Sequence, residues 1–188
     1  LVEFLRNIPN HERDTIETVR LAIDARQHLF DMAERENIDF DHESRGILHV
    51  YRDAEAMAQG RHANRLLARG GLVRHEVTGA ELRTIEPALP ENLYGGFYTD
   101  SDSTGDIHKF TRGLADACVR RGAALLTDTE IVSLHASPGE VRVEMRRPDG
   151  DSDVARFDKI VVCAGVGSRA LAAMVGDRVN IYPVKGYS

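Results

Sequence analysis

A glycine-rich segment near residue 165 has residue types and spacing that could bring backbone close to a phosphate. The segment is Gly165-Val166-Gly167-Ser168-Arg169-Ala170, which matches the pattern G-x-G-x-x-G/A. It follows an apolar run and precedes a predicted helix, so backbone N–H groups and a helix start could face a phosphate. The same small residues also suit a tight strand-to-helix turn without a ligand, and locally this is the simpler interpretation.

Three features of the sequence count against an independent nicotinamide site at this segment. The segment lies near the end of the chain, whereas such fingerprints open a domain. The strand predicted next, 179–184, ends with Pro183 and Lys185 rather than with an acid that could hold a ribose. A strand meander also precedes the segment, which an ordinary dinucleotide-binding unit does not need.

Cysteine and histidine offer little further chemistry. Cys163 lies in an apolar run and Cys118 on the apolar face of a predicted helix, so both are expected to pack in the core rather than react. They form no CxxC pair, which favours a reducing compartment. The eight histidines show no HExxH and no close ligand spacing, so we expect no metal site.

An acidic loop, 100–106, is a second candidate for a ligand site. Asp100, Asp102 and Asp106 could suggest calcium, but the loop lacks the twelve-residue ligand pattern and its closing Glu. We expect a solvated loop with Asp106 as the N-cap of the next helix. His108 could line a substrate cleft, although an ordinary residue at a helix start is the simpler interpretation.

Composition limits the classes of protein that the chain could represent. Its 188 residues are 42% hydrophobic and 29% charged, enough for a real core in one domain or two small lobes. The net charge of −6 argues against a general nucleic-acid surface. No apolar run approaches the roughly 20 residues of a membrane span. The chain opens in an apolar segment without Met and stops in an apparent strand, so we expect an interior piece of a longer protein.

The first part of the chain is rich in predicted helices. Apolar spacing predicts a long helix over 10–36, and glycine signals end two further helices at Gly70 and Gly122. Thr78 and Glu81 form a capping box that opens a short helix, which must end before Pro87. Short strands are predicted at 46–51 and 94–98.

After Gly122 the pattern changes to strands. Strands are predicted at 125–126, 131–134, 141–146 and 154–157, with turns at 137–139 and 148–150. The run 160–165 is apolar throughout, as expected for a strand buried on both faces. A helix over 168–175 and a last strand over 179–184 follow. The predicted fold class is α/β, or α+β within this chain.

The order of these segments resembles the D-amino-acid oxidase/dehydrogenase superfamily of flavoproteins. The resemblance rests on Gly122-Ala123 with Ile131-Val132-Ser133-Leu134, the meander, 160–165 with Ser168, and Pro183-Val184-Lys185-Gly186. The upstream runs Gly46-Ile47-Leu48, Glu86-Pro87-Ala88-Leu89, Gly96-Phe97-Tyr98 and Gly105 to Phe110 resemble the bacterial D-amino-acid dehydrogenase branch. Nearly the whole chain takes part in the resemblance.

The resemblance implies an FAD cofactor and a share of its site. It places the backbone of Ile131 at the adenine, and Cys163, Ala164 and Gly165 near the adenosine and pyrophosphate. Residues 183–187 would cross back toward the isoalloxazine. It further implies that 1–122 holds mainly substrate-lobe and helical elements, and that 123–188 returns to the FAD-binding domain as part of its sheet. The glycine-rich start and the substrate-binding groups of the family are absent from this sequence, so its catalytic residues are unknown and we expect the chain alone to be inactive.

For the intact protein the resemblance implies oxidative deamination of D-amino acids to 2-oxo acids and ammonia, in bacterial amino-acid catabolism. Electrons would pass to a respiratory acceptor, with the enzyme in the cytoplasm or at the cytoplasmic face of the inner membrane. One alternative is a glycine or sarcosine type of amine oxidase that uses oxygen. The other is a non-catalytic module that only binds a partner, since fold alone does not fix function.

Overall fold

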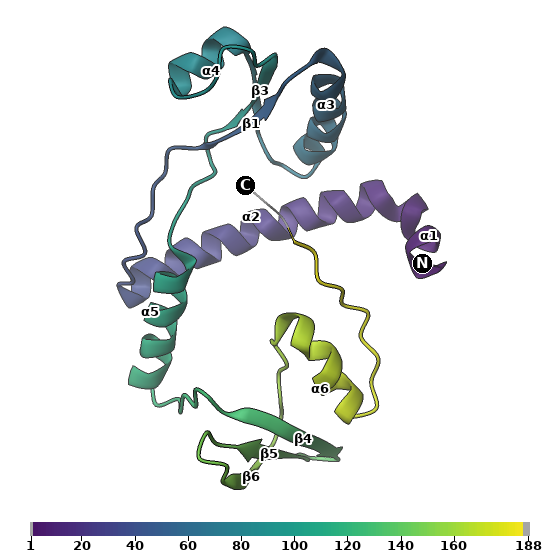
Figure 1. Ribbon diagram of the computed structural model, residues 1–188, viewed down its shortest axis with the longest axis vertical. Helices are drawn as coiled ribbons and strands as arrows, with labels where there is room; N and C mark the ends of the chain where they lie inside the picture. Colours follow the sequence, from purple (N-terminus) through teal and green to yellow (C-terminus); the bar gives the residue numbers. More distant parts are fainter. Residues whose placement is uncertain (1, 186–188) are drawn as a thin grey trace. The chain divides into compact units, whose positions relative to one another are not determined.

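The computed structural model describes residues 2–185 and divides the chain into two compact units (Figure 1). Unit 1 is Leu1–Ala123 and unit 2 is Ala124–Ser188. The segment predicted to cross between lobes, 183–187, therefore lies partly outside the described residues, and its described part, 183–185, has no regular structure.

Unit 1 combines helices with one antiparallel sheet. Its helices are α1 (Val2–Asn7), η1 (Ile8–Asn10), α2 (His11–Glu36), α3 (Ala54–Arg69), α4 (Gly79–Ile85) and α5 (Ile107–Arg120). Its strands are β1 (Ile47–Tyr51), β2 (His75–Thr78) and β3 (Gly95–Thr99), in the order β1-β3-β2.

The long helix α2 packs against other helices near both of its ends. Toward its start, Val19 lies so close to Gly70 that a Cβ built on the glycine would sit 2.6 Å from the valine Cβ. Close approach of backbone therefore explains the glycine that follows α3. Toward its end, Ala33 joins Phe40 and Phe110 in a buried cluster that holds α5.

Helices cover both faces of the three-stranded sheet, with α3 and α4 on opposite sides of β1 and β3 in Figure 1. On one face Gly60 of α3 lies against the ring of Tyr51. On the other, Leu82 of α4 is 0% exposed and approaches Gly96. Side chains alternate between faces along a strand, so β3 is sandwiched and supplies the centre of this core.

Side chains cap the starts of α3, α4 and α5, whereas Asn10, the expected N-cap of α2, makes no side-chain cap hydrogen bond. The Asp53 carboxylate accepts a hydrogen bond from the backbone N–H of Ala56 at the start of α3. Both bonds of the predicted capping box between Thr78 and Glu81 are present. Asp106 caps α5 and accepts from the backbone N–H groups of His108 and Lys109. His108 itself is exposed there, which favours its interpretation as an ordinary helix-start residue.

Unit 2 is built on an antiparallel meander. Its elements are β4 (Glu130–Ser137), β5 (Glu140–Arg146), β6 (Ser152–Phe157), η2 (Gly165–Gly167) and α6 (Ser168–Met174). The strands lie in the order β4-β5-β6, and Leu134, Val141, Val143 and Met145 form the buried core. Leu171 of α6 packs against this cluster, so the helix covers one face of the meander.

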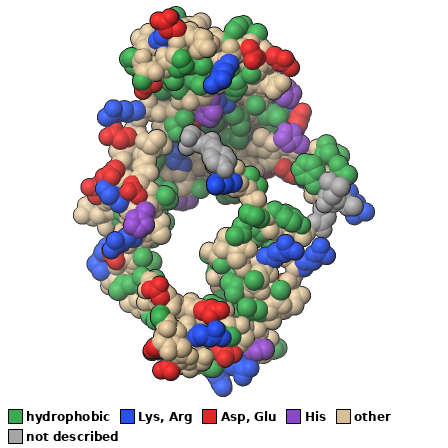
Figure 2. Space-filling view, viewed as in Figure 1, with side chains coloured by type: hydrophobic (Ala, Val, Ile, Leu, Met, Phe, Trp, Pro, Cys, Tyr) green, Lys and Arg blue, Asp and Glu red, His purple; other side chains and the backbone are tan. Residues whose placement is uncertain are grey.

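Three predicted strands of unit 2 are not formed. The segments 125–126, 160–165 and 179–184 belong to no sheet, and the first two are exposed. In the run predicted to be buried on both faces, Val161 is 83% exposed. A strand of that kind needs neighbouring strands and covering helices, and the described part of the chain pairs none with it. Hydrophobic side chains are correspondingly exposed around α6 in Figure 2.

The prediction that both cysteines pack in the core is wrong. Cys118 and Cys163 are both exposed and both are free thiols. Cys163 lies in the unpaired run 160–165, which no helix or strand in the described part of the chain covers. Cys118 follows Ala117, the residue of α5 that faces the core, and so lies on the edge of the apolar stripe rather than at its centre.

Candidate functional site

The predicted cofactor turn, Cys163-Ala164-Gly165, is a short exposed loop that its own hydrogen bonds hold in shape. The backbone N–H of Ala164 donates to the Ser168 hydroxyl at 3.1 Å. The carbonyl of Ala164 accepts from the backbone N–H of Gly167 at 2.9 Å. These bonds tie the loop to the start of α6, so the turn keeps a defined backbone although no strand precedes it.

Gly165 combines a left-handed backbone with open surroundings. Its φ is +53°, and a Cβ built on it would meet no atom within 4 Å. The conformation favours glycine, while the described residues leave the space beside it free. A cofactor edge could therefore contact the backbone here without displacing any side chain, and the residues present fit that use.

Ile131 lies on β4, where it is half-buried and faces Met145 across the β4–β5 pair. The register shifts between Ile131 and Ser133, an irregularity typical of a β-bulge, which re-aims the backbone. Ile131 packs against the same buried cluster as Leu171 of α6. The structure thus puts Ile131 on β4, which contacts α6, the helix that the turn leads into.

Two residues near the turn were missed as site candidates. Ser168 fixes the turn through its hydroxyl. The Arg169 guanidinium lies over the Tyr182 ring, with Cζ 5.8 Å from the ring centroid, and lines a surface hollow with Val166 and Arg178. Ser168 directly follows the G-x-G pattern, and this position in the sequence could have identified it as a site candidate. The Arg169–Tyr182 contact joins residues thirteen positions apart and leaves no local signal.

The acidic loop between β3 and α5 does not gather its carboxylates. Asp102 forms an ion pair with Arg26 at 2.8 Å, Asp100 lies 3.9 Å from His75, and Asp106 caps α5. Hydrogen bonds from the backbone N–H of Lys109, and then of His108, hold the pKa of Asp106 below its ordinary value. Within residues 2–185 no group of three or more His, Cys, Asp or Glu is arranged to hold a metal ion.

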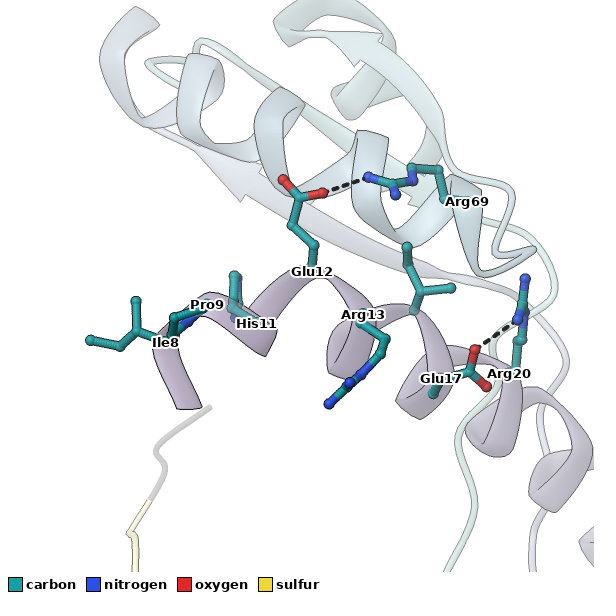
Figure 3. A pocket seen from close by; sticks show the side chains of 9 residues that line it. Ile8, Pro9, His11, Glu12, Arg13, Glu17, Arg20 and Arg69 are labelled. Carbon is teal, nitrogen blue, oxygen red and sulfur yellow. Dashed lines mark hydrogen bonds and ion pairs between the residues drawn. The ribbon is translucent and has the colours of Figure 1, made fainter. Parts of the chain in front are cut away.

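A surface hollow of about 730 Å³ lies on the first turns of α2 and is shown in Figure 3. Its acids and arginines are already paired, with Glu12 bonded to Arg69 and Glu17 to Arg20, each at 2.8 Å. Both pairs are well exposed and therefore contribute little. None of the four predicted cofactor residues lines this hollow, so we assign it no role in the cofactor site.

Comparison with known proteins relates the chain to flavoenzymes. The family model for FAD dependent oxidoreductase matches residues 4–188. D-amino acid dehydrogenase 3 of Mesorhizobium japonicum is 51% identical, with the alignment covering 100% of this chain and 45% of that protein. D-amino acid dehydrogenase of Paramagnetospirillum magneticum is 38% identical over 94% of this chain and 42% of that protein. The chain thus spans less than half the length of these relatives.

The fold is also shared with a solved structure. Glycine oxidase from Geobacillus kaustophilus superposes with a TM-score of 0.69 at 21% identity, covering 85% of this chain and 41% of that one. At this identity the likeness concerns the fold, and it confirms the predicted α/β class. No helix within residues 2–185 is long and apolar enough to cross a membrane.

Proposed function

The chain belongs to the FAD dependent oxidoreductase family, and from that premise we propose that it forms part of an FAD-dependent D-amino-acid dehydrogenase. The observation that carries the proposal is the 51% identity to D-amino acid dehydrogenase 3, which extends over the whole chain. Since the chain spans 45% of that relative, the activity is proposed for the longer protein and not for these residues alone.

The reaction would be oxidative deamination. FAD, when bound, would supply the hydride acceptor for oxidation of the substrate amine. Hydrolysis of the resulting imino acid would give a 2-oxo acid and ammonia, and the electrons would pass on to a respiratory acceptor at the cytoplasmic face of the membrane.

The share of this chain in that reaction is to hold the cofactor. Cys163, Ala164 and Gly165 would present backbone rather than side chains to the adenosine and pyrophosphate. Ile131 would present its backbone to the adenine from the irregular part of β4. The hydrogen bond from Ala164 to Ser168 would keep the turn in place as the cofactor approaches. Unit 1, with its sandwiched sheet, would belong to the substrate lobe.

An amine oxidase that uses oxygen is the second candidate, and the structural likeness to a glycine oxidase is the observation in its favour. That likeness lies at 21% identity, where fold is shared among several chemistries. The sequence relatives favour the dehydrogenase.

A side-by-side assay separates the candidates. The full-length protein is given D-alanine, L-alanine, glycine or sarcosine, and reduction of an artificial quinone or dye is measured in parallel with hydrogen peroxide. We expect D-alanine to drive dye reduction far faster than peroxide formation, and L-alanine to be inert because inversion at the α-carbon turns its hydrogen away from the acceptor. Peroxide formation that matches dye turnover, or activity on glycine and sarcosine alone, would favour the oxidase. Absence of all activity in flavin-loaded protein would favour a binding module.

A further inference from the structure

Arg74 lies in the loop between α3 and β2, and one edge of its guanidinium group is buried without a hydrogen-bond partner in the described part of the chain. Its Cζ lies 4.9 Å from the centroid of the Phe97 ring, so the cation rests on an aromatic face of the sheet. Its Nε and Nη2 atoms are buried, and neither has a hydrogen-bond partner within the described residues. Burying such donors without an acceptor is costly, more so when they carry charge.

A second unpartnered group lies on the same face of the sheet. Thr99 is 0% exposed, and its hydroxyl oxygen is buried without a hydrogen-bond partner. Phe97 and Thr99 are two residues apart on β3, so both point to one face. His49, the register partner of Phe97 on β1, shares that face. Buried polar groups are ordinarily hydrogen-bonded, and two exceptions on one face call for a ligand.

Among the described residues, no acid forms an ion pair with Arg74. Asp102, the acid that acts on His49, is already paired with Arg26 at 2.8 Å. Desolvation of the His49 ring, and then the charge of Arg74, lower the pKa of His49, while Asp102 acts in the opposite direction. Burial and the charge of Arg74 thus both disfavour a positive charge on His49, and Arg74 itself has no ion-pair partner within the described residues.

The pair of unpartnered atoms indicates the chemistry of the ligand. Nε and Nη2 lie on one edge of the planar guanidinium, and two parallel N–H groups of that kind match the two oxygens of a carboxylate. The Thr99 hydroxyl can donate one further hydrogen bond, and the Phe97 ring supplies an apolar floor. We propose that Arg74, Thr99 and the Phe97 face form a binding site for a carboxylate group. The proposal stands apart from the flavin function, since all of its residues lie in unit 1.

The carboxylate could come from a small free acid or from an Asp or Glu side chain elsewhere in the full-length protein. Both sources are tested by thermal unfolding of the full-length protein and of Arg74→Met, which keeps an apolar stem but removes the fork. Arg112→Met is the matched control, because Arg112 is exposed on α5 and has no partner in the described part of the chain. Tm is measured in sodium acetate and in sodium chloride of equal ionic strength.

A free ligand is indicated if acetate raises the Tm of the wild type above its value in chloride by about 2–4 °C or more, and leaves Arg74→Met unchanged. A side-chain carboxylate is indicated if acetate does not change the Tm of the wild type, yet Arg74→Met has a Tm lower than the wild type by a similar number of degrees. Arg112→Met should then keep the Tm of the wild type. The Tm difference between Arg74→Met and the wild type must then shrink as the pH falls below about 4, where a partner carboxylate becomes protonated. Two results overturn the proposal, both with equal Tm values of the wild type in acetate and in chloride. In the first, Arg74→Met has the same Tm as Arg112→Met. In the second, Arg74→Met has a lower Tm, but by the same amount at every pH.

Discussion

At the scale of single residues, Gly165 is the position where a substitution tests the proposed FAD contact most directly. Its left-handed φ of +53° is tolerated by asparagine better than by other side chains, and an added Cβ meets no atom within 4 Å. Gly165→Asn should therefore fold, while placing a side chain where FAD would approach. We expect the full-length variant to lose most of its flavin on gel filtration, measured as bound flavin per protein chain.

Gly139 provides the control for this substitution. It lies in the β4–β5 turn with φ +81° and is equally open, so Gly139→Asn places the same residue in the same type of backbone away from the proposed cofactor surface. Equal flavin retention in the two variants, at matched thermal stability, would show that the Gly165 turn serves only the local fold.

Residue environments were harder to predict than residue positions. The tight turn into a helix after the small residues was predicted correctly, because glycine and serine signals act locally. The strand that was expected to include Cys163, Ala164 and Gly165 is not formed, and these residues lie in the turn instead. Burial of Cys163 was predicted from the apolar residues around it, yet the thiol is exposed. Exposure depends on which elements lie alongside, and an apolar run carries no information about whether such elements are present.

At the scale of secondary-structure elements, the cap of α5 makes stability depend on pH. The folded-state pKa of Asp106 is held below its unfolded value by backbone N–H donors, chiefly that of Lys109. The stability contributed by the carboxylate is present above the unfolded value of about 4 and is lost as the pH falls through the folded value. Asp106→Asn still accepts a hydrogen bond but cannot titrate.

We therefore expect the urea midpoint of the wild type to fall more than that of Asp106→Asn between pH 7 and pH 3. Asp116→Asn should follow the wild type, because Asp116 is exposed within the same helix and does not cap it. Parallel profiles for the wild type and Asp106→Asn would mean that the cap does not titrate with folding.

Helices were predicted better than strands for a physical reason. The starts of α3, α4 and α5 follow from Asp53, Thr78 and Asp106, side chains that bond backbone groups two or three residues away. Such signals lie wholly within the helix. The meander was likewise predictable, since its strands alternate and are joined by turns at Gly139 and Gly150.

The strands predicted at 160–165 and 179–184 failed because each depends on partners distant in sequence. A run with the apolar character of Ile160 to Val162 can pair only if neighbouring strands offer free edges, and no described strand pairs with it. In the proposed full-length protein such neighbours would come from residues that this sequence does not contain. Arg74 shows the same limit at a polar site, since its unpartnered edge could not be predicted from its place in the sequence.

At the scale of the whole molecule, the chain forms two compact units, and we propose that each contributes a separate share of the enzyme. Unit 2 would hold the adenosine side of FAD, and unit 1 would contribute to the substrate lobe and carry the proposed carboxylate site. The family match extends across both units, from residue 4 to residue 188. Since relatives are more than twice as long, the flavin chemistry has to be tested in the full-length protein.

The most direct test is an anaerobic titration of the full-length protein with D-alanine and, separately, with L-alanine, followed by the visible flavin absorbance. We expect purified protein to carry flavin, D-alanine to bleach it completely, and L-alanine to leave it unchanged. Bleaching by a D-amino acid would show in one step that the cofactor is bound and that it accepts electrons from the proposed substrate class. A full-length protein without flavin, or a flavin that D-alanine fails to bleach, would contradict the assignment as a D-amino-acid dehydrogenase.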